Sequence, residues 1–471
     1  MDRQLLIFSR EEATPLYLQI YQRYCQAIAS GALKEGDRVP SVRSLACELN
    51  LARGTIEMAY QMLIAEGYFI SHGAAGTTVA PGLSRLTEES SPLPAPSALG
   101  SATGTTPIRN EMQPFQIGLP ALDLFPRKTW VRLASRHLRN LEMTTPDPGG
   151  HLALRRAIAS YLGISRGIHC QPEQVFITVG YRGALDLIVR TLFQPGDLGW
   201  FEDPGYFHAR QFLEQSGLVL HPVAVDEQGM DVQQGERQAG KARFAVVTPT
   251  HQSPMGCALS LPRRLALLDW AERNQAWIIE DDYDSEFRYH GRPLPTLKSL
   301  DRHGKVLYTG TFSKSLYPGL RMAYLVVPEG QIQRFRDQVI HLPGAGNPVL
   351  QATVADFMEQ GHFTRHLGKM RKAYAQRYGY LAQALALHLG DRIQVLPRAG
   401  GMHLLARLTG TMGDKELVAA AEAGGLALHP LSEWEIRPGA FRGVLMGFAN
   451  FTAAEQANVA VARLAALWPV D

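Results

Sequence analysis

The sequence predicts an α/β protein with two domains of unequal size, and three observations lead to this fold class. First, a chain of 471 residues is too long for one ordinary hydrophobic core. Second, residues 81–113 are rich in Pro, Ser and Gly, which is typical of a flexible linker. Third, strand-like and helix-like segments alternate from residue 114 to residue 471, as in domains with a mostly parallel sheet.

The composition is that of a soluble globular protein, with 45% apolar and 19% charged residues. A net charge of +3 is small for this length and indicates no strongly charged partner by itself. The four cysteines are scattered without a CxxC pair, so we expect free thiols and no metal site. No apolar run approaches the ~18 residues of a membrane span, and no signal core opens the chain. We therefore expect a cytoplasmic protein with no membrane partner.

Residues 1–80 are predicted to form three helices and a hairpin. Pro15 and Gly31 bracket the first helix, Ser41 is a suitable N-cap for the second, and Gly67 ends the third. This order is that of a winged helix-turn-helix, whose third helix enters the major groove of DNA. A small helical interaction module is the alternative. The apolar spacing predicts helices over residues 16–31, 42–49 and 52–65, and strands over residues 68–70 and 77–79.

A family resemblance supports the winged domain. The segments 31–43, 53–55 and 59–67 resemble the GntR family of DNA-binding domains. Residues 1–80 hold seven Lys/Arg and eight Asp/Glu, a net charge of −1, so we expect DNA affinity to depend on two such domains acting together. The resemblance implies that the contacts to double-stranded DNA are made by Arg43, Arg53 and Thr55, by Ser41 on a phosphate, and by His72 and Gly73 in the wing.

The segment 306–327 carries a lysine on a turn between two predicted strands. Lys314 is flanked by hydroxyls, and an arginine follows seven residues later. A lysine in a partly buried turn can lose its proton and attack an aldehyde, and hydroxyls beside an arginine suit a phosphate. These features indicate pyridoxal 5′-phosphate held as a Schiff base on Lys314, with its phosphate bound by Thr311, Ser313 and Arg321. Taken alone, the motif fits a solvated turn lysine at least as well.

Four other motifs follow predicted strands. A glycine-rich turn at 180–185 opens a helix, where backbone N–H groups favour a phosphate. A turn at 202–206 ends in an aromatic residue that could stack on a pyridine ring, and the polar loop 248–256 could point an amide at a ring oxygen. The acidic pair after Ile279 is unfavourable at a strand end unless a cation such as a protonated pyridine is nearby. A calcium-like or solvated acidic turn is the alternative for that pair.

Together these motifs resemble the fold-type I PLP-dependent aminotransferases over residues 114–465. The alternation that supports this includes strands predicted at 175–179, 243–248 and 277–279, and helices at 184–190 and 265–270. The resemblance implies that Lys314 forms the Schiff base and Asp281 holds the pyridine nitrogen. It also implies contacts from Tyr283 and Gln252 to the ring hydroxyl oxygen, stacking by Tyr206, and phosphate binding by the backbone of Tyr181 and Arg182 together with Thr311, Ser313 and Arg321.

A GntR-like domain (1–80), a linker (81–113) and an aminotransferase-like domain (114–471) in one chain resemble the MocR subfamily of bacterial transcriptional regulators. The segments 124–130, 282–289 and 361–371 add to the match. The resemblance implies a homodimer in which each DNA-binding domain packs on the partner's large domain. It also implies a small-molecule effector, an amine, amino acid or vitamin B6 vitamer, that changes DNA affinity at the cofactor site.

The sequence departs from the aminotransferase pattern where a substrate carboxylate would bind. Aminotransferases carry an arginine in an Arg-x-x-Phe segment near the C-terminus, but residues 444–449 contain no arginine. We therefore expect an amine, a vitamer, or an acid held by a displaced arginine such as Arg442. A second departure is Thr145, where relatives commonly have a tyrosine. An active aminotransferase with an accessory DNA-binding domain is the alternative function.

Overall fold

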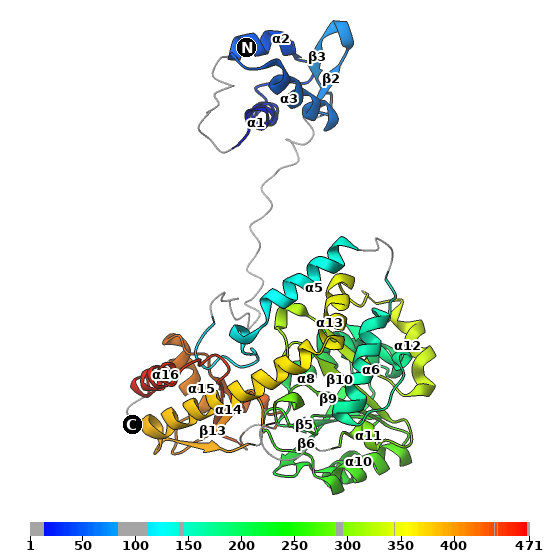
Figure 1. Ribbon diagram of the computed structural model, residues 1–471, viewed down its shortest axis with the longest axis vertical. Helices are drawn as coiled ribbons and strands as arrows, with labels where there is room; N and C mark the ends of the chain where they lie inside the picture. Colours follow the sequence, from blue (N-terminus) through cyan, green and yellow to red (C-terminus); the bar gives the residue numbers. More distant parts are fainter. Residues whose placement is uncertain are drawn as a thin grey trace. The chain divides into compact units, whose positions relative to one another are not determined.

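The computed structural model describes residues 14–82, 112–140, 146–288, 295–342, 344–398, 400–437, 439 and 441–468. The chain divides into two compact units, Met1–Ile108 and Arg109–Asp471. Figure 1 shows the helices and strands of each unit. Most of the predicted linker lies outside the described residues. Within the described residues, none of the helices combines the length and the apolar character that a membrane span requires.

The small unit has the predicted order of three helices and a hairpin. The Ser41 hydroxyl accepts a hydrogen bond from the Ser44 N–H at 3.1 Å, which caps the second helix, and Asn50 ends it in the left-handed region at φ 52°. The elements are α1 (Leu16–Ala29), β1 (Arg38–Val39), α2 (Val42–Leu49), α3 (Arg53–Ala65), β2 (Phe69–Ser71), the 3-10 helix η2 (Gly73–Ala75) and β3 (Thr77–Val79), with the strands in the order β1-β3-β2.

Three buried rings hold the small unit together. Tyr24, Tyr60 and Phe69 meet edge to face with centroids 5.2–5.8 Å apart. The Tyr60 hydroxyl also donates to the Pro40 carbonyl at 2.9 Å. These contacts fix α3 against α1 and against the turn that precedes α2.

The large unit is organised around an eight-stranded sheet in the order β4-β11-β10-β9-β8-β5-β6-β7. Its central strands pair in parallel, and β11 is an antiparallel strand inserted between β10 and β4, so the prediction of a mostly parallel sheet is confirmed. The strands are β4 (Val175–Thr178), β5 (Leu198–Asp203), β6 (Val219–Asp226), β7 (Gly229–Met230), β8 (Phe244–Val247), β9 (Trp277–Asp282), β10 (Val306–Thr311) and β11 (Ala323–Val326).

Helices cover both faces of this sheet, because its strands are apolar on both sides. One face packs against α7 (Gly180–Leu192), α8 (Phe207–Gln215) and α12 (Ile332–Val339). The opposite face packs against α6 (Leu152–Arg166), α9 (Val232–Ala239), α10 (Leu261–Arg273), α11 (Leu297–Leu300) and α13 (Pro348–Glu359), and α5 (Arg127–Arg139) lies on α13.

The C-terminal part forms a second sheet of four antiparallel strands in the order β12-β13-β15-β14. The long helix α14 (His362–Leu389) packs against α16 (Ala454–Ala466) and runs from one sheet toward the other (Figure 1). The remaining elements are β12 (Ile393–Leu396), β13 (His403–Leu408), α15 (Asp414–Ala423), β14 (His429–Pro430), the 3-10 helix η8 (Leu431–Trp434) and β15 (Gly443–Gly447).

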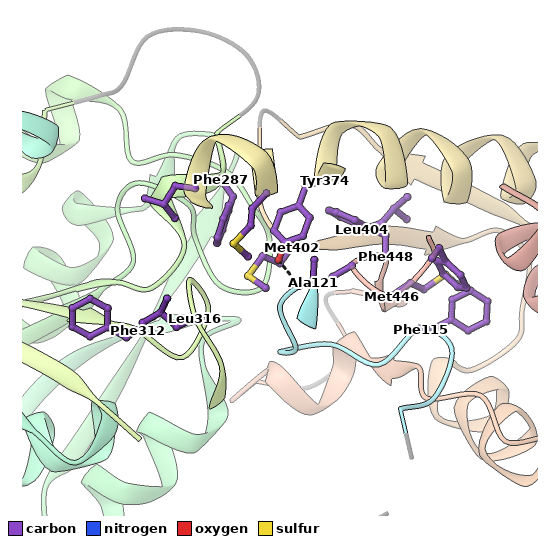
Figure 2. Close-up of a cluster of buried hydrophobic side chains, with 14 of the residues drawn as sticks. Phe115, Ala121, Phe287, Phe312, Leu316, Tyr374, Met402, Leu404, Met446 and Phe448 are labelled. Atoms are coloured by element: carbon purple, nitrogen blue, oxygen red, sulfur yellow. Dashed lines mark hydrogen bonds between the residues drawn. The ribbon is translucent and has the colours of Figure 1, made fainter. Parts of the chain in front are cut away.

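One hydrophobic cluster joins these parts of the large unit (Figure 2). Phe312 and Leu316 come from the turn after β10, while Met402 and Leu404 come from the second sheet. In the middle of the cluster, the buried Tyr374 hydroxyl accepts a hydrogen bond from the Ala121 N–H at 2.9 Å. The segment that opens the large unit is thereby tied to α14.

We expect Tyr374→Phe to destabilise the large unit by about 1–3 kcal/mol, because the Ala121 N–H loses its acceptor while it stays buried. Urea denaturation followed by tryptophan fluorescence measures the loss. Tyr378→Phe, one turn further along α14, is the matched control, since the Tyr378 hydroxyl makes no hydrogen bond with the described residues. Equal denaturation midpoints for the two variants would contradict this role of Tyr374.

Candidate functional site

A cavity of about 630 Å³ opens at the carboxyl ends of the parallel strands, where ligands bind in open α/β sheets. Its walls come from segments far apart in the chain: residues 117–118, the start of α7, the start of α8, the ends of β9 and β10, and the second sheet. Nine of the predicted cofactor-site residues line it, namely Tyr181, Arg182, Tyr206, Asp281, Tyr283, Thr311, Ser313, Lys314 and Arg321.

Lys314 lies on the turn after β10 and reaches across the cavity. Its Nζ donates to the Gly118 carbonyl oxygen at 2.9 Å. Gly118 has φ +84°, a conformation that favours glycine, and a Cβ there would lie 3.2 Å from Nζ, a tight contact. Burial lowers the pKa of Lys314, opposed by the negative charges of Asp284 and Asp281. This environment favours the neutral, nucleophilic form of the amine.

Asp281 lies near the end of β9, opposite Thr309 of β10 in the sheet register. Burial raises the pKa of Asp281 to about 8, and the nearby Tyr181 hydroxyl partly opposes this shift. A carboxylate this deeply buried is stabilised in its charged form by a neighbouring cation. The cavity therefore places a carboxylate suited to a cationic ring nitrogen near the amine of Lys314.

One part of the cavity, called the anion corner and lined by Gly180, Thr311, Ser313 and Arg321, is suited to an anion. Helix α7 begins at Gly180 directly after β4, so its first N–H groups and its dipole point into this corner. The Arg321 guanidinium carbon lies 3.7 Å from the position of a Cβ on Gly180. Thr311 Oγ1 accepts from the Ser313 N–H at 3.1 Å, which places both hydroxyls on the same turn. A phosphate here would meet a positive charge, hydroxyl donors and a helix N-terminus.

Aromatic rings line one wall. The Tyr206 ring lies 6.3 Å from the Tyr181 ring and 5.8 Å from the Trp434 ring, between centroids. Tyr206 precedes α8, whereas Trp434 comes from η8 in the C-terminal part. Such a wall can hold a flat heteroaromatic ring.

Tyr283 and Gln252 have different positions relative to the cavity. Tyr283 lines it, and its hydroxyl lies 3.1 Å from Nδ1 of His251. The Gln252 amide is buried behind the wall instead, where it donates to Glu202 Oε2 and to the Pro204 carbonyl and accepts from the Met255 N–H. Ser253 is the residue of this loop that lines the cavity.

Sequence reasoning missed several residues of the site. Glu202 is buried at the end of β5, and its carboxylate accepts from the backbone and side chain of Thr248, which orders the loop after β8. The cavity wall also includes Gly118, His208, His403, His429 and Trp434. No local motif marks these positions, because they reach the cavity only through the tertiary fold.

The reverse side of β9 carries a buried ionic cluster. Asp282 accepts from Arg166 Nε at 3.1 Å and from the Tyr308 hydroxyl at 2.5 Å, and Glu286 lies 3.5 Å from the same guanidinium. Side chains on a strand alternate between faces, so Asp281 points to the cavity while Asp282 points to this cluster. The cluster therefore anchors the strand that carries Asp281.

The proposed DNA contacts lie on the surface of the small unit. Ser41, Arg43 and Arg53 are exposed at the starts of α2 and α3, and Thr55 is half-buried within α3. The Ser41 oxygen accepts the capping bond, so its hydroxyl proton can still be donated. In the wing, His72 and Gly73 are exposed, and His72 Nε2 lies 3.0 Å from Thr78 Oγ1.

The donor set of the large cavity fits pyridoxal phosphate. The cofactor presents an aldehyde, a basic ring nitrogen and a phosphate, and the cavity offers a lysine amine, a buried carboxylate and an anion corner in a matching arrangement. The aromatic wall suits the ring that connects these three groups.

Comparison with known proteins agrees with both units. Residues 16–79 match the bacterial regulatory proteins of the gntR family, and residues 120–461 match aminotransferase class I and II. The chain is 36% identical to the probable rhizopine catabolism regulatory protein MocR of Rhizobium meliloti, over 95% of this chain and 92% of that one. It is 32% identical to the HTH-type pyridoxine biosynthesis transcriptional regulator PdxR of Corynebacterium glutamicum, over 93% of each chain.

Solved structures resemble the large unit. A kynurenine aminotransferase from Pyrococcus horikoshii, in complex with PMP, has a TM-score of 0.68 and 26% identity, over 75% of this chain and 89% of that one. A multiple substrate aminotransferase from Thermococcus profundus has a TM-score of 0.68 and 27% identity, over 76% of this chain and 92% of that one.

The fold and the cavity define a transcriptional regulator that joins a helix-turn-helix unit to a pyridoxal phosphate-binding, aminotransferase-like domain. More narrowly, the chain belongs to the MocR subfamily of GntR-type regulators. The predicted fold class and cofactor are thereby confirmed.

We expect Glu202→Gln to change how stability depends on pH. Burial raises the pKa of Glu202 to about 7 from its ordinary value of 4.5, so the folded state holds the proton more tightly. The contribution of Glu202 to the free energy of unfolding is then fully present below about pH 4.5 and is lost as the pH rises through about 7. The variant should therefore gain on the order of 3 kcal/mol relative to the natural chain between these pH values.

Urea denaturation at half-unit pH steps measures this difference. Glu214→Gln, at an exposed position of α8, is the matched control and should leave the curve unchanged. A Glu202→Gln curve parallel to that of the natural chain would show that Glu202 does not titrate differently in the folded state.

Proposed function

We propose that the large unit is a sensor. It holds pyridoxal phosphate at Lys314, and an amine, amino acid or vitamin B6 vitamer that enters the same cavity changes the affinity of the small units for operator DNA. The observation that carries this proposal is the buried Lys314 amine within one cavity with Asp281 and the anion corner, in a chain that also has a GntR-type DNA-binding unit.

Each residue has a specific task in this proposal. Bound pyridoxal phosphate supplies a reactive aldehyde and an electron-withdrawing ring. The neutral Lys314 amine would hold the aldehyde carbon covalently, and the Asp281 carboxylate would favour a protonated ring nitrogen. Tyr206 packs on the ring, and Tyr283 lies within the cavity to contact the ring oxygen. Thr311, Ser313, Arg321 and the backbone of Tyr181 and Arg182, which line the cavity, would hold the phosphate.

Gln252 has an indirect task. Its amide hydrogen bonds to Glu202, Pro204 and Met255 are made behind the wall, so we propose that it positions Ser253 and does not touch the ring.

A sensor fits the cavity better than an efficient α-amino-acid transaminase. Among the described residues that line the cavity, arginine occurs only at positions 182 and 321, and Arg321 faces the anion corner. Arg442 is exposed and outside the lining, and Arg437 donates to the Pro222 carbonyl at 3.2 Å. A substrate carboxylate would thus lack the bidentate arginine that holds it in aminotransferases.

Operator binding would require two small units, because residues 1–80 carry a net charge of −1. We propose a cytoplasmic homodimer in which Arg43, Arg53 and Thr55 read DNA, Ser41 contacts a phosphate, and His72 and Gly73 form the wing contact. Position 145, where relatives commonly have a tyrosine, lies outside the described residues.

We expect Lys314→Ala to abolish the covalently attached cofactor and the response of DNA binding to amines, while the chain remains folded. Absorbance spectra after incubation with pyridoxal phosphate, borohydride trapping and a DNA gel shift measure these losses. Lys241→Ala, at an exposed position, is the matched control. A trapped cofactor on Lys314→Ala would assign the attachment to another lysine, and rapid turnover of the natural chain with an amino acid and an oxo acid would favour an enzyme.

We expect Arg53→Ala to weaken operator binding by about 1–3 kcal/mol, because α3 presents this side chain at its first turn. Fluorescence anisotropy with the promoter region of the adjacent genes measures the affinity at several salt concentrations. Arg23→Ala on the exposed side of α1 is the control. If the two variants lose equal affinity, α3 is not the element that reads the bases.

A further inference from the structure

The end of the cavity beyond Lys314 is formed by the second sheet and is lined by imidazole and indole rings. His403 is the first residue of β13, His429 is the first residue of β14, and Trp434 ends η8. His403 and His429 lie outside the parts of the cavity that suit the ring nitrogen and the phosphate, and Trp434 adjoins the aromatic wall beside Tyr206. This end, defined by His403, His429 and Trp434 and called the effector end below, is where a second molecule would meet Lys314.

Both imidazoles at the effector end are uncharged at neutral pH. Burial lowers the pKa of His403 to about 4, and burial also lowers the pKa of His429. A neutral imidazole offers one donor and one acceptor, whereas an imidazolium offers two donors and a charge. The effector end therefore supplies no positive charge from its histidines.

The hydrogen bonding of His403 fixes what it can offer. Its Nε2 lies 3.2 Å from the Pro254 carbonyl oxygen, and a carbonyl can only accept, so Nε2 carries the proton. Nδ1 is then a lone pair, which accepts from an O–H or N–H group and repels a carboxylate oxygen. A carboxylate beside Nδ1 would lose its hydration without gaining a hydrogen-bond donor, which is unfavourable.

The nearby arginines do not supply the positive charge that a carboxylate would need at the effector end. Arg210 donates to the Glu435 carbonyl at 2.8 Å, and Arg398 donates to the Met255 carbonyl at 2.6 Å and pairs with Glu227 at 3.0 Å. Arg182 lines the cavity from α7, where its guanidinium carbon lies 5.1 Å from the centroid of the Phe212 ring. Arg182 is the one cation in the described lining that could still bind an acid outside the anion corner.

We propose that the effector is a primary amine that carries hydroxyl groups and no carboxylate, held at the effector end by His403 and His429 and packed against Trp434. This inference rests on the proposed function and narrows its ligand class. A hydroxyl both donates and accepts, so it complements a neutral imidazole, while the carbon skeleton packs on the indole face. The amine nitrogen would point toward Lys314.

Three small amines with one skeleton test this inference on the full-length chain loaded with pyridoxal phosphate. Serinol (2-amino-1,3-propanediol) has two hydroxyls, serine replaces one hydroxymethyl group with a carboxylate, and isopropylamine has neither. The change in cofactor absorbance and the shift in operator affinity are followed for each amine. We expect serinol to act at a concentration about tenfold or more below those of serine and isopropylamine, since one or two hydrogen bonds separate them.

Variants assign the preference to the effector end. We expect His403→Ala to bring serinol within about twofold of isopropylamine, because the acceptor for the hydroxyl is gone. His388→Ala, at an exposed position of α14, should keep the natural ranking. The cofactor absorbance band before any amine is added tests the proposed function separately. A chain without this band does not bind the cofactor, whatever the ranking of the three amines.

Several outcomes would overturn the inference while the cofactor band persists. Serine acting at lower concentrations than serinol, with the advantage lost in Arg182→Ala, would show an acid-binding site at α7. A serinol preference unchanged in both His403→Ala and His429→Ala, or no response to any of the three amines, would also reject it.

Discussion

Two ionisable groups are withdrawn from water at neighbouring strand ends, and the functional part of the large unit depends on this arrangement. Lys314 follows β10 and Asp281 lies near the end of β9, paired in parallel with β10. Burial favours the neutral form of each, and for Lys314 this effect is opposed by the negative charges of Asp284 and, when it is ionised, Asp281. The apolar strands behind them supply the rigid frame that makes such an unfavourable placement possible.

The frame is reinforced on the side of β9 that faces away from the cavity. Arg166 from α6, Tyr308 from β10 and Asp282 form a hydrogen-bonded group with little access to water. Breaking one member of such a group leaves a buried charge, which is strongly unfavourable, so the group resists any shift of β9 along its neighbours. Asp281 consequently keeps its depth and its distance from the turn that carries Lys314.

Much of this architecture could be predicted from the sequence, and the reasons differ by element. The helices of the small unit were predicted because Pro15, Gly31, Ser41 and Gly67 mark their ends by local chemistry. The strands before Asp281 and Lys314 were predicted because each is a short apolar run followed by polar residues. The MocR family and the cofactor followed from five motifs in one order, and the comparisons confirm them.

Contacts between distant segments could not be predicted in this way. Gly118 reaches the Lys314 amine from a segment 196 residues earlier in the chain, without any motif of its own. His403 and His429 are ordinary first residues of strands in the sequence, and only the packing of the second sheet brings them to the cavity. The side chain of Gln252 was expected at the ring, but a loop sequence does not tell which of two adjacent residues, Gln252 or Ser253, faces inward.

The cavity wall takes residues from both ends of the large unit, at Gly118 and at Trp434. A binding site built in this way exists only when the roughly three hundred residues between these two positions are folded. The unfolded chain has no comparable site. By mass action, each tenfold rise of free ligand above its dissociation constant adds about 1.4 kcal/mol to folding. Vitamin supply would thus govern how long the regulator survives proteolysis in the cell, apart from any effect on the promoter it serves.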